Sequence, residues 1–203
     1  MKSILILSLV LSSQLFAHLP YGDERQFDRK IRLFEEEVEQ ALGKVEAARK
    51  EVELLKLALQ SAQGVQAKGV NNRFQVKLVE MKLNRKIQEI RSLNLDLEKY
   101  RIDGEIAELR RKSAQINRED PDKLKWLHER WNTLHCQQWE AKAAIAKLEA
   151  DYAVWYVEEI QPLVRKRVIS LQENWSEEAK KIQAESTLAA TEKSLAVCQK
   201  ERE

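Results

Sequence analysis

The chain has 203 residues, and its 35 basic and 33 acidic side chains leave a net charge of only +2. This balance argues against a nucleic-acid-binding tail and against a strongly basic membrane-binding surface. Glycine and proline are scarce, with five and three residues. A composition rich in Glu, Lys, Leu and Ala with few helix breakers favours long helices, so we expect an all-α fold built as a rod rather than as a compact globule.

The first 17 residues, MKSILILSLVLSSQLFA, combine an early lysine, a short apolar run and a small residue at Ala17. This order is typical of a secretory signal peptide that is cleaved after Ala17. The apolar run is shorter than the ~20 residues that span a bilayer, which argues against a membrane anchor. We therefore expect an exported chain without a transmembrane segment, periplasmic if the source is bacterial and secreted otherwise. Removal of Lys2 leaves 34 basic and 33 acidic residues.

Residues 18–117 are predicted to form a long antiparallel coiled-coil hairpin. In its first helix the apolar positions alternate in steps of four and three, which is a heptad repeat and indicates a coiled-coil seam. A second helix is expected over about 72–117, and a short connection between two helices of similar length makes them antiparallel. The predicted seam consists of Phe27, Ile31, Phe34, Val38, Val45, Val52, Leu55 and Leu59, with Ala41, Ala48 and Ala62 between them.

The heptad pattern ends at Gly64, and two glycines and two asparagines lie between there and Asn72. Glycine and asparagine tolerate left-handed backbone and terminate helices. We therefore place the reversal of the hairpin at residues 64–72.

Residues 121–203 are predicted to form one long helix that contains the tryptophans. Asp120 fits an N-cap and Pro121 fits the first helical position. At Gln161-Pro162 the pattern allows either a kinked helix or a tight bend that makes a second hairpin, and both alternatives stay open. The apolar series that continues through this point comprises Val157, Ile160, Val164, Val168, Leu171, Trp175 and Ile182.

The two cysteines, Cys136 and Cys198, enter an oxidising compartment if the chain is exported. If the helix reversed at Gln161-Pro162, residue 187 would lie beside Cys136, and Cys198 would lie ~16 Å farther along the helix. A disulfide needs Cα atoms within ~7 Å of each other. A simple hairpin at that point does not support an internal bridge. An intermolecular disulfide in a homodimer and two free thiols remain as alternatives.

No sequence motif indicates an enzyme, a cofactor or a metal site. His128 and His135 are two helical turns apart, ~10 Å along the axis, so one ion cannot bind both without ligands from another helix. Trp126 and Trp139 fall off the predicted seam rows, and exposed aromatic side chains suit a partner surface. The alternative is a wider bundle that buries these two tryptophans.

The segment KGVNNRFQVKLVEMKL, from Lys68 to Leu83, resembles the tip of the α-helical hairpin in periplasmic adaptor (membrane-fusion) proteins of efflux and secretion systems. The hairpins of outer-membrane efflux channels are similar. The resemblance covers residues 40–100, and it implies a tip that docks against a partner's tip. That tip would be Lys68, Gly69, Val70 and Asn71, with Asn71 where these families usually have serine.

These observations favour a non-enzymatic structural or interaction protein. We expect a coiled-coil scaffold or tether in a cell-envelope assembly, which binds itself as a homo-oligomer and binds other envelope proteins. One alternative is an accessory of an efflux or secretion system that docks through the 64–72 reversal. Another is a periplasmic holdase chaperone with helical arms, although such chaperones tend to be more basic than this chain.

Overall fold

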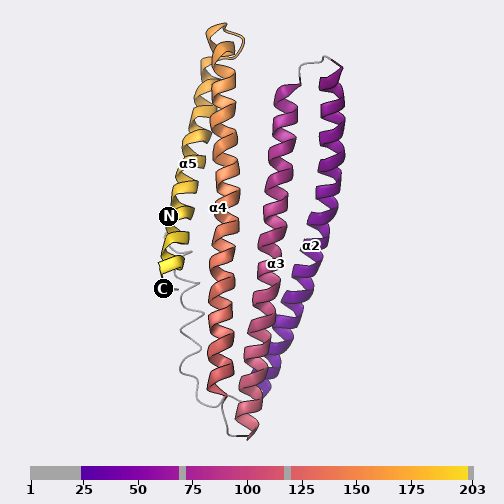
Figure 1. Cartoon of the computed structure of the whole chain (residues 1–203), viewed down its shortest axis with the longest axis vertical. Coiled ribbons are helices and arrows are strands. Elements are labelled where there is room, and N and C mark those ends of the chain that lie inside the picture. Colours follow the sequence, from indigo (N-terminus) through magenta and orange to yellow (C-terminus); the bar gives the residue numbers. More distant parts are fainter. Residues whose placement is uncertain (1–23, 69–71, 117–119, 201–203) are drawn as a thin grey trace.

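The computed structural model describes residues 24–68, 72–116 and 120–200, and in these ranges it is all-α (Figure 1). The predicted signal peptide and the residues that follow it, up to 23, lie outside the described residues. The all-α expectation is confirmed. The four helices are α2 (Glu24–Ala67), α3 (Arg73–Ile116), α4 (Pro121–Arg165) and α5 (Leu171–Lys200).

The helices form an open layer in chain order (Figure 1). The pairs α2 with α3, α3 with α4, and α4 with α5 are in contact, and among the described residues no other pair of helices is. Successive helices run antiparallel, so the layer has two edges, α2 on one side and α5 on the other. Each edge helix therefore has one side that the other described helices leave uncovered.

The predicted seam faces α3. Gly104 of α3 lies opposite Phe34, where a Cβ on the glycine would be 3.8 Å from the Phe34 Cβ. The hairpin is fixed on its flanks by ion pairs from Arg111 to Asp28 (2.9 Å) and from Lys86 to Glu51 (2.8 Å). Seam residues that are buried are Ala41, Val45, Ala48, Val52 and Ala62, while Phe27, Ile31, Phe34, Val38, Leu55 and Leu59 are half-buried.

The reversal between α2 and α3 begins later than the sequence predicts. The helix continues through Gly64 to Ala67, and Lys68 follows as a turn residue. A glycine inside a helix costs only about 1 kcal/mol relative to alanine, which the packing of a 44-residue helix can offset. The side chain of Asn72 closes the end of α2, because its Nδ2 donates to the Ala62 carbonyl at 2.7 Å.

The start of α4 agrees with the sequence. Pro121 is the first helical residue, and the Asp120 carboxylate accepts a hydrogen bond from the Lys123 backbone N–H at 3.1 Å. This contact satisfies one of the N–H groups that a helix start leaves without a partner.

Of the two alternatives at Gln161-Pro162, the chain forms the second hairpin, but it reverses later than the sequence predicts. The helix α4 passes through Pro162 and ends at Arg165, and the chain reverses over residues 166–170. Arg167 has φ 55°, the left-handed conformation that commonly ends a helix. Its backbone N–H donates to the Val164 carbonyl at 2.9 Å, so the last turn of α4 is closed without glycine.

The new helix begins with a reciprocal cap. The Ser170 hydroxyl accepts from the Glu173 backbone N–H at 3.1 Å, and the Glu173 carboxylate accepts from the Ser170 backbone N–H at 3.0 Å. These hydrogen bonds lower the pKa of Glu173. The pair is a capping box, S-x-x-E, and it sets where α5 starts.

Ser170→Ala is expected to lower the free energy of unfolding by about 1 kcal/mol, because the N–H of Glu173 loses its acceptor. Urea unfolding monitored by circular dichroism measures this change. The control is Ser176→Ala, which alters an exposed serine inside the same helix. Equal effects of the two substitutions would contradict a capping role for Ser170.

Candidate functional site

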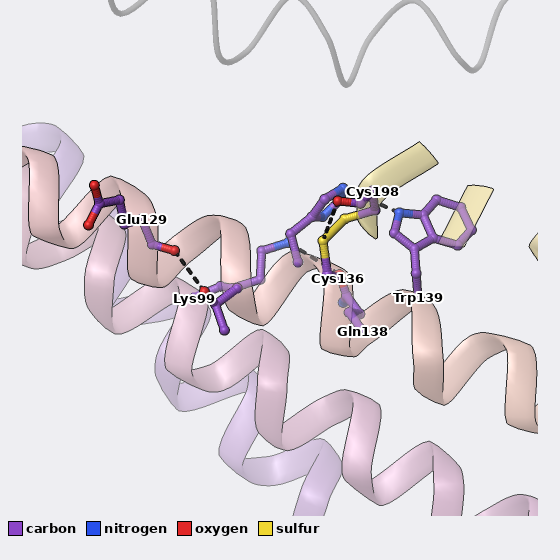
Figure 2. Close-up of a disulfide and its surroundings, with 8 residues drawn as sticks. Lys99, Glu129, Cys136, Gln138, Trp139 and Cys198 are labelled. Atoms are coloured by element: carbon purple, nitrogen blue, oxygen red, sulfur yellow. Dashed lines mark hydrogen bonds between the residues drawn. A yellow bond between two sulfur atoms is a disulfide. The ribbon is translucent and has the colours of Figure 1, made fainter. Parts of the chain in front are cut away.

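A disulfide joins the two last helices. Cys136 of α4 and Cys198 of α5 are bonded within one chain, their Cα atoms are 5.6 Å apart, and both residues are buried (Figure 2). The expectation of an intermolecular disulfide or of free thiols is therefore wrong. The error came from the assumed reversal point. The midpoint between the two cysteines is residue 167, which lies in the observed turn.

A buried glutamine beside the disulfide links α4 to α3. The Gln138 amide donates to the Asp96 carboxylate, and its carbonyl oxygen accepts from the Lys99 ammonium at 3.2 Å. The same ammonium lies 4.4 Å from the centroid of the Trp131 ring, which is cation–π range. Burial is the largest influence on Lys99 and lowers its pKa. Figure 2 shows Lys99, Gln138 and the disulfide in one neighbourhood.

Asp103 lies where three helices meet. Burial, with a smaller contribution from the nearby Glu37 carboxylate of α2, raises the pKa of its carboxyl group to about 6. Three groups lower this pKa because they favour the charged carboxylate: the Trp131 indole N–H, Lys99 and His128. The indole N–H lies near the carboxylate but outside strict hydrogen-bond geometry. The desolvation of Asp103 outweighs these contacts, so the ionised carboxylate destabilises the folded state.

Asp103→Asn is expected to raise the free energy of unfolding at pH 7.5 by up to about 2 kcal/mol and to change it little at pH 4. The folded-state pKa lies above the ordinary value of 3.8. The folded protein therefore binds more protons between these values, and the wild type loses stability as pH rises through about 6. Urea unfolding at both pH values measures the effect. A substitution that destabilises the protein equally at both would contradict this role of Asp103.

An aromatic ladder runs along α4. The ring of Trp131 stacks on His135 at 5.2 Å between centroids, and the Trp139 indole N–H donates to the His135 Nε2 at 3.3 Å. Lys142 caps the ladder, with its ammonium 4.6 Å from the Trp139 ring. A shallow groove between α4 and α5 is lined by Trp139 together with Ser186, Thr187, Ala190, Thr191 and Ser194.

The two candidate partner tryptophans therefore differ. Trp139 is half-buried and packs within the layer, as the wider-bundle alternative predicts. Trp126 is exposed over half of its surface, with the Arg130 guanidinium 5.5 Å from its ring centroid. Of this pair, Trp126 is the one that a partner can reach.

The predicted docking tip is placed only in part. Lys68 is exposed at the end of α2, whereas Gly69, Val70 and Asn71 lie outside the described residues. Leu55 and Leu59, which lead toward the tip, are half-buried seam residues. In the part of the chain that the structure describes, no group of three or more His, Cys, Asp or Glu side chains is arranged to hold a metal ion. No described helix has an apolar stretch that would span a membrane.

The helix α5 has an apolar surface whose exposure the sequence does not predict. In the predicted apolar series, Val157 and Ile160 of α4 are buried. The members of the series from Val168 onward are exposed. The exposed fractions are 69% for Val168, 67% for Trp175 and 64% for Ile182. Trp175 and Ile182 of α5 are spaced by seven, and Ala189 and Ala196 continue the same row and are exposed too, whereas Val168 lies in the turn before the helix. We call this set the α5 row: Trp175, Ile182, Ala189 and Ala196.

Comparison of the chain with protein-family models, with curated proteins and with solved structures finds no match.

Proposed function

We propose that this protein is an extracytoplasmic scaffold or tether that binds other envelope proteins through the edges of its helical layer. The observation that carries the proposal is the exposure of large apolar side chains on both edge helices. Leu54 and Leu57 of α2 are 67% and 62% exposed, and Trp175 of α5 is exposed to the same degree. Large apolar residues gathered on an exposed face are typical of protein-binding surfaces.

Two further features support the same function. The four helices are each 30–45 residues long, so an α4-sized helix spans ~65–70 Å at the helical rise. A layer of this length can hold two partners far apart. The disulfide between Cys136 and Cys198 is of the kind that persists in oxidising compartments, which supports export.

Photo-crosslinking in the native envelope tests this function. A photoreactive amino acid is placed at Leu57 on one edge, at Trp175 on the other edge, and at Lys82 as a control on an exposed position of the inner helix α3. We expect discrete adducts from the edge positions, identified by mass spectrometry, and a lower yield from Lys82. Adduct yields at both edges no higher than at Lys82 would contradict the proposal.

The proposed compartment has its own test. Export with cleavage after Ala17 predicts that the protein recovered from the envelope begins at His18, with its cysteines protected from alkylation until a reductant is added. Intact-mass spectrometry before and after reduction measures both properties. A recovered chain that still carries Met1 in the cytoplasmic fraction would contradict the localisation. The predicted homo-oligomer stays a prediction, which sedimentation of the full chain tests.

A further inference from the structure

The helix α5 packs against α4 through a face that is only half-buried. Among its residues from Leu171 to Lys200, Cys198 alone is buried, and that residue is held by the disulfide. The α5 row points away from α4 along the whole helix, and Leu171 beside it is 62% exposed. A seven-residue apolar repeat is the pattern with which one helix packs against another. The row thus has the form of a coiled-coil seam that no other helix of the described residues covers.

One flank of the row is acidic. Glu178, Glu185 and Glu192 repeat at the same seven-residue spacing, each three positions after a member of the row. Residues three and four apart are neighbours on a helix surface, so each carboxylate lies beside the apolar seam. Within the described residues none of these three carboxylates forms an ion pair, although the neighbouring Glu177 pairs with Lys180 at 2.7 Å. The acidic flank is therefore available to basic side chains of another protein.

A second copy of α5 fits this surface poorly. In an antiparallel pair related by a two-fold axis, each flank faces the same flank of the copy, so the three glutamates would face glutamates. In a parallel pair each row residue faces itself. Two Trp175 rings would then hold the helices apart at one end, while Ala189 and Ala196 would leave a gap at the other. Charge disfavours the first arrangement, and side-chain size disfavours the second.

We infer that the α5 row binds an amphipathic helix of another protein, whose apolar heptad positions cover the row and whose flanking lysines or arginines pair with Glu178, Glu185 and Glu192. Flanking charges of this kind select partners and fix their orientation in helix pairs. This inference rests on the proposed scaffold function and names the class of partner for one of its two edges.

Two matched peptides test the inference with the full, oxidised chain. Both are 28-residue helices with leucine and alanine at heptad positions. One has lysine on the flank of the seam and the other has glutamate there. Binding is followed by isothermal titration calorimetry, and the change in tryptophan fluorescence is recorded beside it. Because the net charge of the chain is close to zero, a preference between the peptides reports the local flank. We expect the lysine peptide to bind roughly 10-fold more tightly at low salt, as three exposed ion pairs allow.

Charge reversal gives the decisive control. The variant with Glu178, Glu185 and Glu192 all changed to lysine is expected to prefer the glutamate peptide instead. Trp175→Ala should weaken binding at least 10-fold, as loss of a central aromatic contact does, whereas Trp126→Ala on α4 should not change it. Circular dichroism confirms that the variants stay helical.

Three results would overturn the inference. They are equal affinity for the two peptides, no binding of either at millimolar concentration, and self-association of the full chain that Trp175→Ala abolishes. The last would mean that a second copy covers the row. Failure of the peptides to bind, with edge adducts still found at Leu57 in the envelope, would leave the scaffold function intact and remove only this partner.

Discussion

Reduction of the disulfide is expected to lower the free energy of unfolding by about 4 kcal/mol and to release α5 from the layer. Cys136 and Cys198 are 62 residues apart in the chain, and closing a loop of that length restricts the unfolded ensemble by about this amount. The effect falls on α5 because Cys198 is the one buried residue of that helix. Without the bond, half-buried contacts and the turn at 166–170 alone hold α5 against α4.

Hydrogen exchange measured by mass spectrometry, with and without a dithiol reductant, checks this prediction. Exchange is expected to rise by orders of magnitude across 171–200 and to change little in α3, which has helices on both sides. The control is the same comparison in the Cys136→Ala, Cys198→Ala double variant, which should not respond to the reductant. Unchanged protection of α5 after complete reduction would show that non-covalent packing suffices to hold it.

Leu127→Ala is expected to lower the free energy of unfolding by about 3 kcal/mol, the second largest of the expected effects. Leu127 of α4 has no exposed surface and packs with Ile102, Ile106 and Leu134, so this buried cluster joins the two halves of the layer. Truncation of a buried leucine removes its transfer free energy and leaves a cavity.

Urea unfolding of Leu127→Ala, monitored by circular dichroism, measures the loss. The matched control is Leu57→Ala on α2, where the leucine is 62% exposed, and it should change stability by less than about 0.5 kcal/mol. Similar losses for the two variants would mean that the α3–α4 contact does not limit the stability of the chain.

The sequence predicted the helices well because their signals are local. The heptads of α2 predict the seam, in which Val45 and Val52 are buried. Asp120-Pro121 predicts the start of α4. The proline at 162 is a misleading signal for the reversal after α4, because the start of α5 is set by the capping box of Ser170 and Glu173, which stands in the sequence as S-x-x-E. An arginine in left-handed conformation at 167 leaves no comparable trace in the sequence.

The candidate sites were harder to predict because they depend on which helices touch. The pairing of Cys136 with Cys198 depends on where the chain reverses. A prediction that misplaces the reversal therefore misses the disulfide. The surroundings of Asp103 combine residues from α2, α3 and α4, and no spacing along the chain reveals that meeting point. The α5 row was visible as an apolar series, but its exposure depends on the absence of a fifth helix beside α5 among the described residues.

Each described helix contacts only the helices next to it in the chain, and this affects how the protein folds. The ion pairs of Asp28 with Arg111 and of Arg73 with Glu159 each join helices that follow one another in the chain, and among the described residues no contact joins α2 to α5. Where each element contacts only its neighbours, structure can form at one element and extend to the next. The chain can therefore gain structure progressively from α2 onward, each helix using the previous one as its template, and oxidation of the cysteines completes the last addition.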